Sequence, residues 1–585
     1  MNASAPPRRK DFLLFSLLAT LCISAATYGV WKICGRPMYG TDDANIFFVY
    51  ARNFVHGQGI VYNIGGEHVE GFTSTLYFLV CSLALFAFRQ PEAALFVMNL
   101  LFAVFTSACL LYVLDQLADQ LHLSRSGRFL LFGSYLLWIA SNPAYFAWNI
   151  VTLMDSGIYS MLLTVGYALL ASLLLRDAPA TRRSAIALAA LSSLCILSRP
   201  EGLGWAILLV CAFACIVWAQ RRSARTTLPI AGIPFVVLLA TYVALTGFRE
   251  AYFGYPLPNT FYAKVSTPLA TFHDGRLYFH LFLRSYGVAF LVPLVMGIAW
   301  IFYVLVRRQQ TNKLFWFGVL TAIFSFVGLA IPVAEGGDHF GSFRMYQNVY
   351  PLLGLSLLLP LLPFVKSRRK STWAMYILVV FLLVAGTSHV TWRSFREANQ
   401  PFPVVPQHPV DTQLSMQVES TVANSQRLVG YSLDRIFEGG LPSIGVSAAG
   451  GEAYTYHGTI DDLLGLNDSK MAHADKIKVG FKDHASFNAN VFYDRSPDIL
   501  EPGTAPFGSP VDLEALRMQD LAPGSFHNAI FKGIFHEDRF RSIYTLALVY
   551  NPSYPSEMAF GYFRKPYLNA LTLERGFVVL RRIDL

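Results

Sequence analysis

Two adjacent carboxylates, Asp42 and Asp43, directly follow the first hydrophobic segment of the chain. Apolar side chains recur behind them at helical spacing, and Gly57 and Gly59 mark a stop, which predicts an amphipathic helix over 43–57. One of the two acids could act only as a helix N-cap. A cap explains one side chain, however, and the chain is poor in acids. The pair therefore favours general-base chemistry at a membrane surface.

A carboxylate base that activates a hydroxyl beside a membrane suggests transfer from a lipid phosphate. Such a reaction needs cationic groups to hold the departing phosphate and an apolar groove to hold the lipid. Each candidate cation could equally be a side chain that reaches the headgroup level. The first choice follows two acids in a glycine-bearing loop, which can hold and aim it. The candidates are Arg344, then Arg199, Lys264, His339 and Arg52.

The elements that must position these residues are membrane spans. The chain has 585 residues, of which 54% are hydrophobic and only 14% are charged. Soluble domains carry roughly 25% charged residues, and about 20 apolar residues cross a bilayer. We expect eleven spans, at 12–31, 91–115, 128–148, 156–175, 184–198, 203–219, 228–247, 279–305, 314–333, 347–365 and 372–391.

The basic residues predict how the spans are oriented. Residues 1–391 hold 28 Lys and Arg against 15 Asp and Glu, whereas residues 392–585 hold 18 against 22. The basic clusters fall at every second connection, as the positive-inside rule requires. This alternation of basic connections agrees with a cytoplasmic N-terminus only if residues 72–88 do not cross the membrane and lie along its outer surface. The helices over 43–57 and 72–88, and with them the whole first loop 33–90, are therefore expected outside.

The same count places residues 392–585 outside, as an α/β domain. Alternating stretches at 541–550 and 576–581 predict strands. The strip that begins at 427–431 and continues through 445–456 and 459–466 predicts strand, glycine turn and strand. The expected fold is thus a polytopic α-helical membrane protein, residues 1–391, with a C-terminal α/β domain.

Several function classes receive no support from the sequence. The basic excess belongs to the membrane part, so it does not indicate nucleic-acid binding. None of the seven cysteines has metal-ligand spacing with histidines, and Asp338 with His339 gives only two neighbouring ligands. We expect no metal or other cofactor to be required, although a divalent metal remains an alternative. Nucleotide-binding glycine motifs are missing, which fits a lipid phosphate donor.

Four stretches of the chain resemble a known family in the same order. They are Thr41-Asp-Asp-Ala through Gly66-Glu-His-Val-Glu-Gly-Phe-Thr73, Leu197-Ser-Arg-Pro-Glu-Gly202, Tyr255-Pro-Leu-Pro-Asn-Thr260 and Ile460-Asp-Asp-Leu-Leu-Gly-Leu466. The family comprises the GT-C-fold arabinofuranosyltransferases, in particular the terminal β-(1→2)-arabinofuranosyltransferases of actinobacterial cell walls. One stretch, Leu153-Met-Asp-Ser-Gly157, departs from the Gly-x-Glu-Thr motif usual in that family.

The resemblance implies inverting transfer from a polyprenyl-phosphate sugar, by this analogy decaprenyl-phosphoryl arabinofuranose, with a first-loop aspartate as base. We expect Asp42 to be that base, with Asp43 second. The acceptor would be a glycan or glycoprotein outside a bacterial cytoplasmic membrane. A transporter or flippase of lipid-linked sugars and a structural scaffold are the alternatives. The residues expected at the sugar or acceptor are Glu70, Asp155, Glu201, Asn259, Tyr262 and Asp338.

Overall fold

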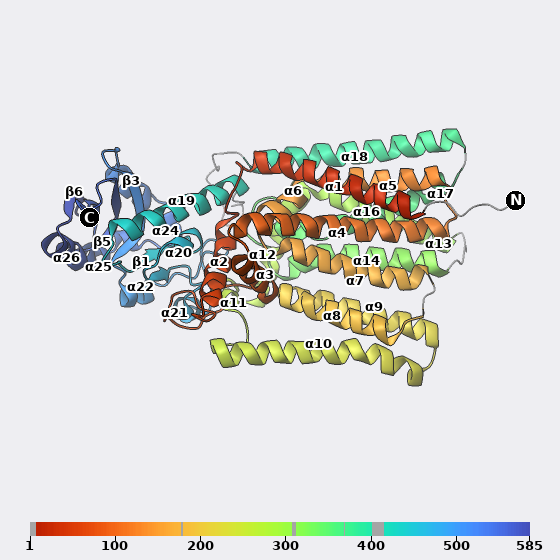
Figure 1. Cartoon of the computed structure of the whole chain (residues 1–585), viewed down its shortest axis with the longest axis horizontal. Coiled ribbons are helices and arrows are strands. Elements are labelled where there is room, and N and C mark those ends of the chain that lie inside the picture. Colours follow the sequence, from red (N-terminus) through yellow and green to blue (C-terminus); the bar gives the residue numbers. More distant parts are fainter. Residues whose placement is uncertain (1–7, 177–178, 307–311, 368, 400–414) are drawn as a thin grey trace.

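The computed structural model describes residues 8–176, 179–306, 312–367, 369–399 and 415–585. Long helices that lie side by side form a bundle, and a smaller domain that contains the β-sheet lies at one end of it (Figure 1). This arrangement confirms the predicted fold class, a largely helical chain with candidate membrane spans and a C-terminal sheet domain.

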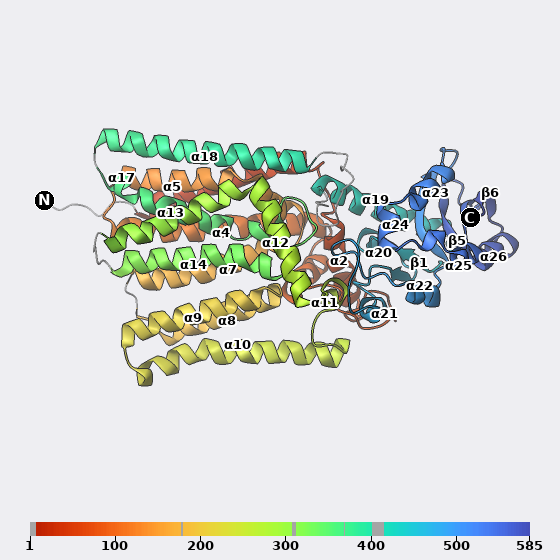
Figure 2. The same ribbon diagram turned by 180° about the vertical axis from the view of Figure 1, so that it is seen from behind.

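Eight helices in the described part of the chain are long and apolar enough to cross a membrane. They are α1 (Arg8–Ile33), α4 (Pro91–Gln120), α7 (Ser156–Leu175), α9 (Gly202–Arg221), α10 (Ala224–Phe253), α13 (Gly287–Val306), α14 (Asn312–Ala334) and α18 (Lys370–Ala398). Shorter elements stand at the other three predicted spans and lie among the long helices (Figures 1 and 2). These are α5 (Arg125–Ala140), α8 (Arg182–Ser198) and the pair α16 (Tyr350–Leu358) and α17 (Leu362–Lys366), joined by the 3₁₀ turn η2 (Leu359–Leu361).

One predicted span, 128–148, ends early. Its helix, α5, stops at Ala140. The chain then forms the short helix α6 (Pro143–Phe146) and the π-helical turn η1 (Ala147–Val151). A proline at the first position of a helix begins a new helix rather than continuing the previous one, which accounts for the break.

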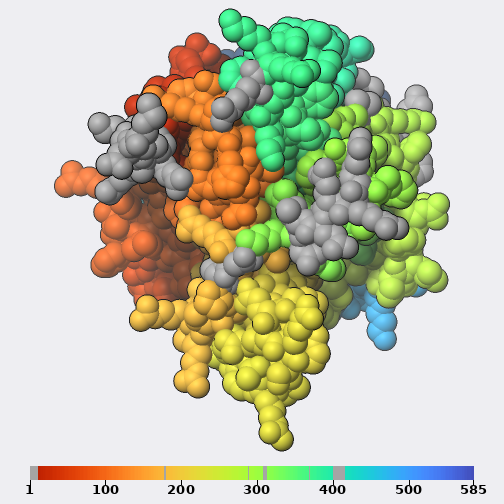
Figure 3. Space-filling view, turned by 90° about the vertical axis from the view of Figure 1, so that its right-hand side faces the viewer, coloured from red at the N-terminus to blue at the C-terminus, as the bar shows by residue number. Residues whose placement is uncertain are grey.

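A second predicted span, 279–305, is divided between two helices. Its first part belongs to α12 (Pro268–Ser285), which crosses the bundle obliquely in Figure 2. The remainder forms α13, which begins at Gly287. Seen from the end opposite the sheet domain, the yellow helices α8 to α10 project from the rest of the bundle (Figure 3).

The two helices predicted in the first loop are both present. They are α2 (Asp42–Val55) and α3 (Thr75–Ala87), and they lie at the end of the bundle that faces the sheet domain (Figure 1). With 13 residues, α3 is about 20 Å long. This length is less than the roughly 30 Å of a bilayer core, which agrees with the expectation that α3 lies along the surface.

The C-terminal domain is built on a six-stranded mixed sheet of order β2-β1-β3-β5-β4-β6. β1 pairs with β2 and β3 in parallel, and the other pairs are antiparallel. The strands are β1 (Ile444–Val446), β2 (Ile460–Asp462), β3 (Ile499–Pro506), β4 (Tyr544–Tyr550), β5 (Glu557–Arg564) and β6 (Val578–Ile583). The helices around them are α19 (Met416–Ile436), α20 (Gly451–Thr455), α21 (Ser469–Ala474), α22 (Ala489–Arg495), α23 (Leu513–Leu521), α24 (Phe526–Ile530), the 3₁₀ turn η3 (Ile534–His536), α25 (Asp538–Ile543) and α26 (Lys565–Arg575).

The strand predictions are partly right. The stretches at 541–550 and 576–581 contain β4 and β6, and two short strands, β1 and β2, lie near the predicted glycine turn. The prediction of a strand at 427–431 is wrong, because this stretch lies inside α19. An alternation of apolar and polar residues over only five positions can arise by chance. The 21-residue helix begins where the Ser415 side chain caps its first turn.

Side chains of α2 and of the loop after it bind the C-terminal domain directly. The Tyr50 hydroxyl donates to the Asn467 side-chain oxygen at 3.0 Å, and the Tyr62 hydroxyl donates to the Ala449 carbonyl at 2.7 Å. These contacts join α2 and the loop after it to the C-terminal domain.

Candidate active site

A cavity of about 770 Å³ lies where the helix bundle meets the C-terminal domain. Its walls come from α2, the turn between α8 and α9, α10, the short helix α11 (Asn259–Lys264), α12 and the loop after α14. Residues 466, 478–483 and 485 of the C-terminal domain also line it. Segments more than 400 residues apart in sequence thus line one cavity.

Of the two neighbouring acids, Asp43 lines this cavity and Asp42 does not. The Asp42 carboxylate instead accepts hydrogen bonds from the backbone N–H groups of Gly450 at 3.0 Å and Gly451 at 2.7 Å, at the start of α20. Burial raises the pKa of Asp42 to about 6, although the Gly451 N–H bond lowers it. Asp42 is therefore held at the domain contact, whereas Asp43 faces the cavity. Which of the two acts as the base stays a prediction.

A buried ion-pair group lies on the cavity wall at the turn that follows α8. Arg199, which is 7% exposed, donates to Asp155 at 2.8 Å and also binds Glu201. Burial alone would lower the pKa of Arg199, but the two carboxylates raise it above its ordinary value. The Oδ2 atom of Asp155 has no hydrogen-bond partner among the described residues. All three predicted residues therefore meet at one place in the lining.

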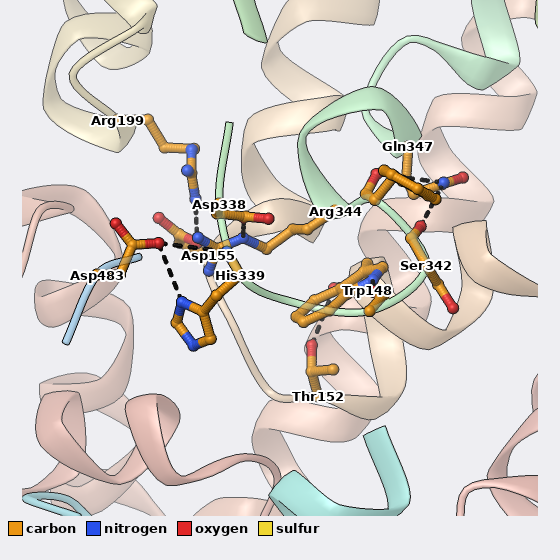
Figure 4. Close-up of polar contacts among 12 residues, drawn as sticks. Trp148, Thr152, Asp155, Arg199, Asp338, His339, Ser342, Arg344, Gln347 and Asp483 are labelled. Carbon is orange, nitrogen blue, oxygen red and sulfur yellow. Dashed lines mark hydrogen bonds and ion pairs between the residues drawn. The ribbon is translucent and has the colours of Figure 1, made fainter. Parts of the chain in front are cut away.

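Arg344 reaches the cavity from the first position of the short helix α15 (Arg344–Gln347). Its Nε donates to Asp338 at 2.9 Å (Figure 4). Its guanidinium lies over the ring of Phe340, 4.5 Å from the centroid. The preceding residue, Phe343, has a φ of 53°, a strained conformation that turns the chain sharply. The two terminal nitrogens of Arg344 have no partner among the described residues, so they remain available to an anion.

Three lysines add positive charge to the lining. Lys264, at the end of α11, donates no hydrogen bond and forms no ion pair in the part of the chain that the structure describes. Lys482 lies 3.5 Å from Asp274. Lys478 donates to a backbone carbonyl and to Ser486. The C-terminal lysines were not predicted, because nothing in the local sequence shows that they contact a helix bundle 200 residues away.

Three predicted residues do not line the cavity and instead connect parts of the fold. Arg52 donates to the Tyr454 carbonyl at 2.5 Å, and Asn259 donates to the Gly465 carbonyl at 2.8 Å. Tyr262 packs against the His473 ring, 4.2 Å between centroids. Their polar or aromatic groups contact the C-terminal domain, and a role in binding phosphate or sugar stays a prediction.

Two further predicted residues lie just behind the lining. Glu70 forms a bidentate ion pair with Arg249, at 2.7 and 3.0 Å, and Arg249 itself lines the cavity. His339 lies 3.0 Å from the Asp483 carboxylate, through its Nδ1 (Figure 4). Glu70 and His339 thus contact cavity-lining residues, Arg249 and Asp483, and do not line the cavity themselves.

Among the described residues, no group of three or more His, Cys, Asp or Glu side chains is arranged to hold a metal ion. That no metal is required stays a prediction. Apolar side chains also line the cavity. They include Ile196, Leu203, Tyr242, Leu245 and Phe261.

No family model matches the sequence, and no curated protein is similar to it in sequence. The fold is similar to solved structures of the oligosaccharyltransferase of Archaeoglobus fulgidus. The apo form is 11% identical, with a TM-score of 0.45, over 94% of this chain and 74% of that chain. The complex with zinc and sulfate is 11% identical, with a TM-score of 0.39, over 96% and 75%. The complex with an inhibitory peptide and a dolichol-phosphate is 12% identical, with a TM-score of 0.35, over 99% and 76%. At this level of similarity, the function has to be argued from the site.

Proposed function

We propose that this protein is a membrane glycosyltransferase that moves a sugar from a polyprenyl-phosphate donor to a hydroxyl of a glycan or glycoprotein. The observation that carries the proposal is the cavity itself. Asp43, which has no hydrogen-bond or ion-pair partner among the described residues, lines the same cavity as Lys264, as Arg344, whose two terminal nitrogens are unpaired in that part of the chain, and as several apolar side chains. A base, an anion site and a lipid surface are the three parts that the reaction needs.

In this proposal the reaction is a single displacement with inversion. Asp43 accepts the proton of the acceptor hydroxyl while its oxygen attacks the anomeric carbon of the sugar. The bond from that carbon to the phosphate oxygen breaks, and the lipid phosphate leaves with the electron pair. Arg344 and Lys264 stabilise the added charge.

The distribution of basic residues supports an active site outside the cytoplasm. The connections between α9 and α10 and between α17 and α18 lie at the bundle end far from the sheet domain (Figure 1). They carry Arg221, Arg222, Lys366 and Arg369. Short basic loops stay on the cytoplasmic side. The cavity and the C-terminal domain are then on the outer face of a bacterial cytoplasmic membrane.

The donor sugar is proposed from the sequence resemblance alone. The stretches that resemble terminal arabinofuranosyltransferases include Asp43, Arg199 and Glu201, all of which line the cavity. D-arabinofuranose from decaprenyl phosphate is therefore the first donor to test. Asp155 stands where that family has Glu, and it is bound by Arg199 at this wall. A hexose donor is the matched comparison.

The test uses the full-length protein in detergent or liposomes, with polyprenyl-phosphate arabinofuranose and polyprenyl-phosphate hexose offered separately. Appearance of a glycosylated acceptor, or slow release of free sugar to water, is expected with one donor. Movement of the labelled lipid across a liposome bilayer with no cleavage would instead identify a flippase. Absence of cleavage with both donors and a range of envelope glycans would overturn the proposal.

A further inference from the structure

The C-terminal domain contributes a lysine to the cavity that the proposed reaction does not yet use. Lys482 lines the cavity, and its side chain is 13% exposed. It belongs to the junction segment, residues 475–488, which connects α21 to α22 without a helix or a strand. An ammonium group has three N–H donors. In the described part of the chain, only Asp274 accepts from this one, at 3.5 Å.

The junction segment is attached to the helix bundle on both sides of Lys482. The backbone N–H of Lys478 donates to Ser266 Oγ at 3.1 Å. The Asp483 carboxylate accepts from the backbone N–H of His339 at 3.2 Å and lies 3.0 Å from its Nδ1 (Figure 4). Asp483 has a φ of 64°, which residues other than glycine rarely adopt. These contacts fix the backbone from which the Lys482 side chain extends.

The helix α12 places Lys482 near Arg344. Asp274 and Tyr278 are four residues apart on α12 and share one face. Asp274 is the acid that accepts from Lys482. One turn further on, the Tyr278 hydroxyl donates to Asp338 at 3.2 Å, and Asp338 accepts from Arg344 Nε at 2.9 Å. Successive turns of one helix face are about 5–6 Å apart, so the acids that hold the two cations are neighbours.

The loop after α14 gives a second, independent placement. A Cβ built on Gly336 would lie 3.1 Å from Lys482 Nζ, so the ammonium group lies against this loop. The same loop continues to Asp338, two residues later, and then to Arg344. Lys482, Asp338 and Arg344 all line the cavity. Each of the two cations is paired with one acid and keeps other N–H groups without a partner among the described residues.

Resting on the proposed function, we propose that Lys482 binds the donor phosphate together with Arg344. One phosphate oxygen then accepts from the terminal nitrogens of Arg344 and another accepts from the Lys482 ammonium group. When the phosphate leaves with the electron pair, both cations stabilise its added charge. The donor site is therefore formed jointly by the bundle and the C-terminal domain, and it is complete only when the junction segment contacts the bundle.

The experiment compares two probes on the full-length protein in detergent. One is a short prenyl methyl phosphodiester, which carries one negative charge, and the other is its neutral dimethyl triester. Lys482→Ala should raise the Kd of the diester about tenfold, the scale of one charge-assisted hydrogen bond. It should raise the Kd of the triester by about threefold at most, because a neutral hydrogen bond is roughly half as strong. Lys482→Gln should show the same difference and replaces the Ala variant if that protein does not fold.

Two further variants serve as controls. Lys476→Ala removes the same charge from the same segment, but Lys476 is exposed and does not line the cavity. It should leave both Kd values unchanged. Asp274→Asn removes the acid that holds Lys482 and keeps the ammonium group. It should bind the diester at least as tightly as the wild-type protein, because the carboxylate no longer competes with the phosphate.

The outcomes separate the inference from the proposed function. A loss of affinity for the diester that is confined to the Lys482 variants supports the inference. Equal losses for the two probes in Lys482→Ala, or the same loss in Asp274→Asn, would show that this lysine only joins the C-terminal domain to α12. Either result, or unchanged diester binding in Lys482→Ala, overturns the inference and leaves the proposed function standing. A wild-type protein that binds neither probe overturns both.

Discussion

Asp43→Asn is expected to abolish glycosyl transfer while the protein keeps its fold and its donor affinity. The Asn side chain has nearly the same shape, and the Asp43 carboxylate lines open space rather than holding another element. Loss of a positioned general base typically costs a factor of about 10² to 10⁴ in rate. We expect single-turnover transfer at saturating donor to fall within that range, with a donor Kd within about threefold of wild type.

Asp42→Asn is the matched variant, because it changes the neighbouring residue in the same way. Asp42 accepts from two backbone N–H groups through both carboxylate oxygens. An amide has one oxygen, so one N–H loses its acceptor and faces an NH₂ group. Losing a charge-assisted hydrogen bond costs on the order of 1.5–3 kcal/mol. This variant should therefore lower Tm by several degrees and leave transfer by the folded fraction within about tenfold.

Both variants are measured by thermal melting in detergent and by transfer in liposomes with the donor established for the wild-type protein. The reasoning would be refuted if the two variants exchanged their effects on transfer and on Tm. If Asp42→Asn abolishes transfer at an unchanged Tm while Asp43→Asn remains active, the base is not the acid that faces the cavity. Full activity in both variants would show that neither aspartate of α2 is the general base.

Four further outcomes are expected. Lys264→Ala should raise the donor Kd about tenfold in a binding titration, since a free cation is removed from the anion site. Arg344→Lys should lower kcat/KM roughly a hundredfold in transfer kinetics, because Lys has no planar fork to bind both an acid and a phosphate. Gly450→Ala should lower Tm strongly, as its Cβ would lie 1.9 Å from a backbone oxygen at the start of α2, whereas Gly386→Ala, with nothing within 4 Å, should leave Tm unchanged. The ordinary pKa of Glu419 is 4.5, and burial raises it to about 8 in the folded protein. The free energy of unfolding of the wild-type protein should therefore fall by on the order of a few kcal/mol as pH rises between these values. Thermal melts of Glu419→Gln should not show this decline.

The membrane part of the fold could be predicted because apolar runs of about 20 residues have few other interpretations. What the runs do not show is where a helix stops inside one. The run 279–305 is apolar throughout, yet the chain breaks after Ser285 and α12 takes a different direction from α13. The helix α19 was missed for the opposite reason. Its mixed composition gave no long apolar run, so a five-residue alternation at 427–431 dominated the interpretation.

The candidate site was partly predictable because polar residues at the ends of spans have few alternative positions. Asp43, Arg199 and Arg344 were named for that reason, and all line the cavity. That Asp43 and not Asp42 lines the cavity could not be predicted, since it depends on which of the two meets the N–H groups of Gly450 and its neighbour, 408 residues away. Contacts at such separation leave no local pattern in a single sequence.

The two neighbouring acids have complementary roles in the proposed mechanism. Asp42 binds the start of α20 and so fixes the first turn of α2 against the C-terminal domain. A neighbouring residue on that turn, Asp43, then has little freedom to move relative to the cavity walls. A base that must meet a hydroxyl within hydrogen-bonding distance gains rate from such rigidity, because misplacement by about 1 Å can cost a hundredfold. The C-terminal domain therefore contributes to the proposed chemistry even where it does not touch the substrate, by holding the residue beside the base.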